Sequence, residues 1–138
     1  MSQKFQVLKV KRLLSQIDEY GLDVPDGFSE LTLDYIADNY NGAGPDWMPE
    51  EMRDILTWLL SIFEPAFLIH DMEYSASNRT AKGFIAANSR MWRNIRKIIN
   101  YEYPRYNPFC WINHVKWYLR GAAAYRACKR FGWSAWTD

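Results

Sequence analysis

Cysteine and histidine are scarce in this chain of 138 residues, which contains two of each. Cys110 and Cys128 are too few for the disulfide framework that stabilises many small secreted domains, and in a reducing compartment we expect two free thiols. The two cysteines and two histidines also match no zinc-ligand spacing. The sequence therefore argues against a disulfide scaffold and against a zinc site.

The chain also lacks a long hydrophobic run. Lys4, Lys9, Lys11 and Arg12 interrupt the only apolar pattern near the N-terminus. No secretory signal peptide is predicted for this reason, and no stretch is long enough to cross a bilayer as a helix. We therefore expect a soluble protein that is made in the cytoplasm and does not span a membrane.

Strand patterns and a nucleotide-binding loop are missing as well. Gly42 and Gly44 lack the following lysine and the preceding strand that a phosphate-binding loop requires. Aromatic residues, in contrast, are plentiful, with seven Trp, nine Tyr and seven Phe. These exceed the needs of a small core, so some should lie on a surface that meets a partner or a lipid interface.

The net charge of +1 conceals a division along the chain. Residues 1–78 carry five Lys or Arg and fourteen Asp or Glu, whereas residues 79–138 carry twelve and two. A basic half can form a patch for phosphates, in nucleic acid or on an anionic lipid surface. The alternative is that the two halves fold against each other and partly neutralise their charges.

Hydrophobic periodicity predicts an all-α fold in a single domain, residues 1–138, which is long enough to bury a core without disulfides or metals. Gly, Asn and Pro mark residues 40–47 as a loop. The first expected helix ends at Gly21, and the second runs from Leu31 to about Asn39 after an N-cap at Ser29. Four further helices are expected, from Pro49 to about Phe63, from Pro65 to about Ala76, from Ala81 to Tyr101, and from Trp111 to Phe131.

His70 and Asp71 stand side by side in an apolar run between Pro65 and Tyr74. Two titratable groups in a buried helix need a structural or functional reason. His70 and Tyr74 are four residues apart and share a helix face, while Asp71 points about a quarter turn away. One helix can therefore present an imidazole and a carboxylate to neighbouring sites.

A geometric argument pairs His70 with Asn88. If the two helices around them are antiparallel about a turn centred near Arg79, both residues lie at the same distance from that centre and can face one another. Asn88 can then accept the N–H hydrogen bond of the ring and leave the other ring nitrogen free as a base. The pair equally fits a buried histidine that an asparagine satisfies for structure alone.

Several features, in this order, resemble the phospholipase A2-like family. Asn41-Gly-Ala-Gly-Pro45 is similar to the calcium loop of the family, and His70-Asp-Met-Glu-Tyr74 matches its HDxxY helix. Residues 87–92 are similar to its second helix, which packs antiparallel to the first. Residues 126–136 resemble the basic, aromatic ending of small phage and prophage proteins of this type. The resemblance covers residues 39–136 and leaves residues 1–38 as an N-terminal helical extension.

The resemblance implies a calcium-dependent hydrolase of phospholipids or other acyl esters. Asp71 would supply a carboxylate to Ca2+, and the loop with Gly42 and Gly44 would add backbone carbonyls. His70 would take a proton from the water that attacks the ester carbonyl, while the metal would stabilise the oxyanion. Tyr74 would donate a hydrogen bond nearby and help to hold the pair.

One departure from the family keeps a second function open. Asn88 stands where the family has an aspartate, and a neutral amide can hold a tautomer but cannot stabilise an imidazolium by charge. The alternative is a phospholipase-like scaffold with little or no catalysis, which binds a membrane or a phage or host protein. In either case we expect the protein in the host cytoplasm or in a virion.

Candidate contacts for lipid or phosphate lie in the basic half. Arg90, Arg93 and Lys97 follow one helix face, where solvation is the simpler explanation of their charge. Trp133 and Trp136 can dip into a lipid interface, or they can cover the core at the end of the chain. We expect a phospholipid or anionic lipid surface, rather than nucleic acid, as the anionic partner.

Overall fold

Helices make up every regular element in the computed structural model, which describes residues 3–40 and 49–137. The predicted all-α class is confirmed, and the described residues contain no strand. The α-helices are α1 (Gln3–Tyr20), α2 (Leu33–Asn39), α3 (Glu50–Leu59), α4 (Glu64–Ser75), α5 (Ala81–Glu102), α6 (Trp111–Phe131) and α7 (Trp133–Thr137), and the 3-10 turns are η1 (Phe28–Glu30), η2 (Ser61–Phe63) and η3 (Pro108–Cys110).

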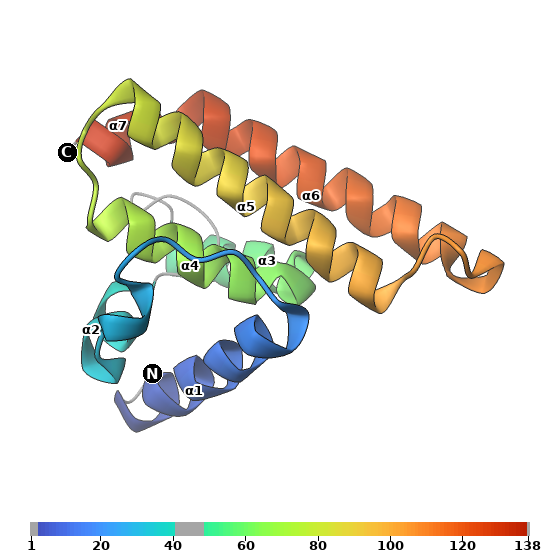
Figure 1. Ribbon diagram of the computed structural model, residues 1–138, viewed down its shortest axis with the longest axis horizontal. Helices are drawn as coiled ribbons and strands as arrows, with labels where there is room; N and C mark the ends of the chain where they lie inside the picture. The colour runs from blue at the N-terminus through green and yellow to red at the C-terminus, as the bar shows by residue number, and fades with distance from the viewer. Residues whose placement is uncertain (1–2, 41–48, 138) are drawn as a thin grey trace.

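The two longest helices, α5 and α6, form an antiparallel hairpin, and α4 packs antiparallel to α5 (Figure 1). α1 and α2 contact α4 and each other. The end of the hairpin that carries η3 extends beyond the rest of the molecule (Figure 1). Among the described residues, no helix is long and apolar enough to span a membrane.

The turn between α4 and α5 is centred where the sequence predicts it. Arg79 has a left-handed backbone conformation, with φ of 59°. The Ser77 hydroxyl accepts a hydrogen bond from the Arg79 N–H at 3.0 Å, and Asn78 Oδ1 accepts one from the Thr80 N–H at 3.0 Å. Thr80 then caps α5, because its hydroxyl accepts from the Gly83 N–H at 3.0 Å. The predicted antiparallel pair about Arg79 is therefore confirmed.

The start of α2 differs from the prediction. Ser29 lies in η1, and α2 begins at Leu33 after Thr32, whose side chain accepts a hydrogen bond from the Tyr35 N–H at 3.1 Å. Both residue types are good N-caps, so local propensity does not choose between them. Burial of Phe28 in the core holds residues 28–30 in a tight turn and delays the helix.

Two further boundaries depend on packing. The helix predicted from Pro49 to Phe63 ends at Leu59 and is followed by η2, which buries the Phe63 side chain completely. The chain end after Gly132 adds the short helix α7, which the periodicity does not predict. Five residues are too few for a hydrophobic period to be visible in the sequence.

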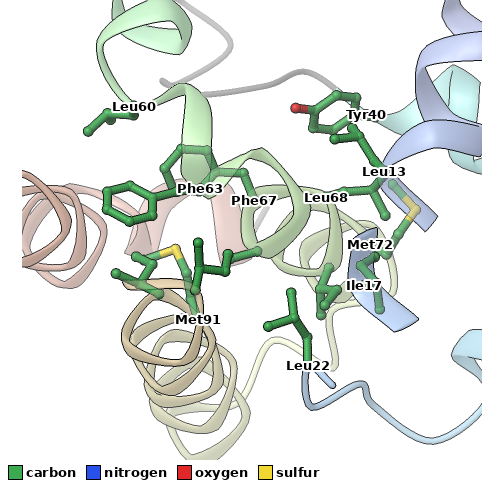
Figure 2. Close-up of a cluster of buried hydrophobic side chains, with 14 of the residues drawn as sticks. Leu13, Ile17, Leu22, Tyr40, Leu60, Phe63, Phe67, Leu68, Met72 and Met91 are labelled. Carbon is green, nitrogen blue, oxygen red and sulfur yellow. The ribbon is translucent and has the colours of Figure 1, made fainter. Parts of the chain in front are cut away.

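The core is built around α4. Eight of its twelve residues are buried, so the helix is covered nearly all round and shows little amphipathic character. Leu68 and Met72 extend toward Leu13 and Ile17 of α1, and on the other side Phe63 and Phe67 lie above Met91 of α5 (Figure 2). α4 therefore carries His70 through the middle of the molecule, between α1 and α5.

Candidate functional site

The antiparallel packing of α4 and α5 brings His70 and Asn88 together. The ring Nε2 of His70 lies 2.8 Å from Oδ1 of Asn88, and the two residues are 8% and 1% exposed. An amide oxygen can only accept, so Nε2 carries the ring proton and Nδ1 carries the lone pair. The pairing that the sequence predicts is thus present in the structure.

Tyr74 completes this group from the next turn of α4. Its hydroxyl donates to the same Asn88 Oδ1 at 3.2 Å, and its ring centroid lies 4.4 Å from that of His70. The amide nitrogen of Asn88, in contrast, is buried without a hydrogen-bond partner among the described residues. The Asn88 side chain is thus surrounded by two hydrogen-bond donors and no acceptor. A carboxylate, which only accepts, would fit these surroundings better than an amide.

Burial sets the protonation states in this group. It lowers the pKa of His70 to about 4, against a smaller upward effect of the hydrogen bond to Asn88. The ring is therefore neutral at neutral pH, which is the form that a general base requires. Burial also raises the pKa of Tyr74, so its hydroxyl stays protonated and remains a donor.

Asp71 is partly buried beside this group, and its charge acts on residues of three segments. Burial first, and then the charge of Asp71, raises the pKa of Cys128 in α6 to about 12. Burial is the main reason why the pKa of Tyr74 is raised, and the Asp71 charge adds to this shift. Burial and then the charge of Glu64 raise the pKa of Tyr40, and the Asp71 charge adds to that shift as well. The Asp71 carboxylate thus lies near α6 and near Tyr40, the residue that directly precedes the predicted calcium loop.

The predicted metal ligands are only partly described. Gly42 and Gly44 lie outside the described residues, so their positions relative to Asp71 are not part of the structure. Within residues 3–40 and 49–137, no group of three or more His, Cys, Asp and Glu side chains is placed to hold a metal ion. A calcium site here would need one carboxylate and several backbone carbonyls, a donor set suited to this ion.

α7 closes the site from the end of the chain. Trp136 is 4% exposed, and its ring packs edge-on against Tyr74 with the centroids 5.1 Å apart. Its indole N–H donates to the Thr80 carbonyl at 2.9 Å, while the Ser77 hydroxyl donates to the Trp136 carbonyl at 2.5 Å. Trp136 therefore covers the core and binds the turn between α4 and α5, which is the second of the two alternatives that the sequence left open for it. Trp133 remains 44% exposed.

Gly132, which the sequence analysis did not single out, allows this closure. A Cβ atom at this position would lie 2.6 Å from the Tyr74 hydroxyl and 2.5 Å from the Cys128 carbonyl. A larger residue would push α7 away from the site or displace Tyr74. The only local signal in the sequence was a glycine between Phe131 and Trp133 at the end of a long helical pattern.

The basic residues of α5 have partners within the chain. Arg90 forms ion pairs with Asp23, at 3.0 Å, and with Glu73. Arg93 pairs with Asp23 at 2.9 Å, and Lys97 donates to the Gly21 carbonyl at 3.1 Å. These contacts join the acidic and basic parts of the chain, and they engage Arg90, Arg93 and Lys97 within the chain itself.

No family model, curated protein or solved structure matches this chain. The residues that the structure brings together are His70, Asn88 and Tyr74, with Asp71 beside them. A neutral imidazole whose Nε2 donates to Asn88 can accept a proton through Nδ1.

Proposed function

We propose that the protein is a calcium-dependent hydrolase of phospholipids or other acyl esters, of phage or prophage origin, in which His70 activates water. The observation that carries this proposal is the 2.8 Å hydrogen bond between His70 Nε2 and Asn88 Oδ1, which leaves Nδ1 as the base. Further support comes from the order of the Gly-rich loop, the HDxxY helix and the antiparallel second helix, and from Tyr74, which donates to the same oxygen.

In the proposed reaction, Nδ1 of His70 accepts a proton from a water molecule as its oxygen attacks the ester carbonyl. The bond between the acyl carbon and the alkoxy oxygen then breaks, and the imidazolium returns the proton to the leaving alkoxide. Asn88 and Tyr74 hold the ring in one tautomer throughout. When bound by Asp71 and backbone carbonyls of the loop, Ca2+ supplies positive charge for the oxyanion.

Asn88 supports a second candidate function, a scaffold that binds a membrane or a phage or host protein without hydrolysis. The amide gives the imidazolium no opposite charge, and burial already disfavours the charged ring. A site with these properties stabilises the neutral resting state more than the charged intermediate. The replacement of Asn88 by a carboxylate therefore separates the two candidates.

The first test is a calorimetric titration of the chelator-treated protein with Ca2+. Wild type is expected to bind, and Asp71→Asn to lose at least about tenfold in affinity, because a charged ligand is removed. Asp26→Asn, which removes an exposed carboxylate elsewhere, is the control and should bind as wild type does. Equal calcium affinity of wild type and Asp71→Asn would contradict the proposed metal site.

The second part of this test measures fatty-acid release from phospholipid vesicles by mass spectrometry with Ca2+ present. We expect slow release by wild type, none by His70→Ala, and release about tenfold faster or more by Asn88→Asp, since a carboxylate stabilises the imidazolium. Circular dichroism checks that each variant is folded. No release by wild type or by Asn88→Asp would favour the scaffold over the enzyme.

A further inference from the structure

The exposed face of α6 carries a continuous row of large apolar side chains. Trp111, Ile112, Val115 and Leu119 are spaced by one, three and four residues, which places them on one side of the helix. All four are exposed, and Ile112 is 85% accessible to solvent. The buried face of α6, which includes Trp117 and Gly121, points toward α5.

Two large aromatic residues that precede α6 are exposed as well. Phe109 is 94% exposed and Tyr106 is 88% exposed. They belong to the end of the α5–α6 hairpin that projects beyond the rest of the molecule (Figure 1). The six residues Tyr106, Phe109, Trp111, Ile112, Val115 and Leu119 are called the apolar tip. Soluble monomers rarely expose so many large apolar side chains together unless the surface binds something.

Hydrogen bonds order the backbone around the apolar tip. Asn107 Oδ1 accepts a hydrogen bond from the Phe109 N–H at 3.0 Å, and the Trp111 indole N–H donates to the Arg105 carbonyl at 2.8 Å. His114 anchors the start of α6, since its Nδ1 lies 2.8 Å from the Tyr103 carbonyl. Phe109 and Trp111 therefore belong to a folded segment with an ordered backbone, which lowers the entropic cost of binding.

Basic residues continue the same helix face toward the C-terminus. Arg126 follows Leu119 by seven residues, which is about two helical turns, and Lys129 and Arg130 follow within the next turn. All three are exposed, and none forms an ion pair with another described residue. Residues 103–137 contain six Lys or Arg and no Asp or Glu. One surface is thus apolar at the tip and positive beyond it.

We infer that this surface of α6 docks on an anionic phospholipid membrane, with the apolar tip at the boundary between headgroups and acyl chains. Exposed aliphatic and aromatic side chains next to exposed cations are the combination that binds such an interface. Nucleic acid would engage the cations and the rings but would leave Ile112, Val115 and Leu119 without a partner. A second copy of the chain would bring two positive surfaces together.

This docking surface is separate from the His70 site. It contains none of His70, Asp71, Tyr74 and Asn88, and it uses neither a bound calcium ion nor hydrolysis. Membrane binding through α6 can therefore be measured in a chelator, where the proposed reaction does not run. Its outcome is independent of whether the proposed enzymatic function holds.

The test is co-sedimentation of the full chain with vesicles in the presence of EDTA. Wild type is expected to bind vesicles of phosphatidylcholine mixed with phosphatidylglycerol, to bind pure phosphatidylcholine vesicles much more weakly, and to dissociate as salt is added. Ile112→Glu should weaken binding by about tenfold, because it places a charge in the apolar contact.

The matched control is Asn113→Glu. Asn113 is exposed and adjacent to Ile112, but it points about 100° away around α6, so the same charge is added outside the apolar row. Binding by this variant should fall by less than about threefold, through the change in net charge alone. Circular dichroism should give wild-type helicity for both variants.

Four outcomes would overturn the inference. The first is the absence of vesicle binding by wild type, and the second is an equal loss in Ile112→Glu and Asn113→Glu. The third is self-association in analytical ultracentrifugation that Ile112→Glu abolishes while vesicles remain unbound, which would assign the face to a second copy. Binding of single-stranded DNA without binding of vesicles would likewise replace the membrane by nucleic acid.

Discussion

At the scale of single residues, the buried His70 connects stability with the proposed chemistry. Its ring is neutral because burial opposes the charged form, and Asn88 fixes the tautomer by accepting from Nε2. The neutral state that makes Nδ1 a base is the same state that the fold favours. Conditions that protonate the ring should therefore weaken the fold.

The pH dependence of stability follows from this shift. The pKa of His70 falls from 6.5 to about 4 on folding, so the unfolded chain binds more protons in this interval. The stability that the neutral His70 ring contributes is fully present above the unfolded pKa of 6.5. About 3 kcal/mol of unfolding free energy should be lost as the pH falls to about 4. Urea denaturation at a series of pH values measures it.

The comparison that isolates His70 is with His70→Gln, because other acidic groups titrate in the same range. Glutamine retains a side-chain donor for Asn88 but cannot be protonated. The variant should lose less stability than wild type over this interval, by about 3 kcal/mol. Identical pH profiles for the two proteins would show that His70 is not neutral and buried in solution.

The pairing of His70 with Asn88 could be predicted from the sequence, because the helical period and a turn at Arg79 fix which residues of two adjacent helices meet. The unpaired amide nitrogen of Asn88 could not be predicted in the same way. It depends on what the other neighbours offer, and Tyr74, one of these neighbours, supplies a second donor to Oδ1 and no acceptor to the amide nitrogen.

At the scale of elements, the close approach of α5 and α6 depends on a small residue. A Cβ atom at Gly121 would lie 2.5 Å from Ile95 Cγ2 of α5 and 3.3 Å from the Phe63 ring. Phe63 also packs edge-on against Trp117, with the centroids 5.6 Å apart. The α6 side of this contact therefore has no room for another methyl group.

Gly121→Ala should lower the unfolding free energy by up to about 2 kcal/mol. Overpacking against Ile95 costs about 1 to 3 kcal/mol, and better helix propensity offsets about 1 kcal/mol of this cost. Chemical denaturation provides the measurement. Ala123→Gly, at an exposed position of the same helix, calibrates the propensity effect alone, and a stabilised Gly121→Ala protein would contradict the close packing.

The existence of the longer helices was predictable at this scale, but α7 and several helix boundaries were not. Periodicity gives the long helices because their buried faces repeat along the chain. The choice of Thr32 over Ser29 as the N-cap of α2, and the end of α3 at Leu59, depend on where Phe28 and Phe63 are buried. Burial is a property of the assembled core and has no local signature.

At the scale of the whole molecule, ion pairs join segments of opposite charge that are distant in sequence. Asp23 contacts Arg90 and Arg93, and its backbone N–H donates to Asn94 Oδ1 at 2.8 Å. Arg93 and Arg90 lower the pKa of Asp23, with the hydrogen bond from Arg93 as the largest cause. These contacts hold the segment between α1 and η1 against α5.

Asp23→Asn should destabilise the protein by about 1 kcal/mol at low salt, because the pairs are partly exposed and screened by solvent. The difference from wild type should shrink at high salt. Thermal unfolding at two salt concentrations measures both effects. Asp26→Asn, an exposed residue of the same segment, should change stability little, and an equal effect of the two variants would argue against these ion pairs.

The sequence by itself determined the all-α class, the antiparallel pair about Arg79 and the facing of His70 and Asn88, since helical period and turn chemistry are local properties. Tertiary structure decided which charged and aromatic side chains stay exposed. It buried Trp136 over Tyr74, paired Arg90 with Asp23, and left the outer face of α6 with Ile112 open. These outcomes depend on which helix faces cover one another, and that is settled only when distant segments pack together.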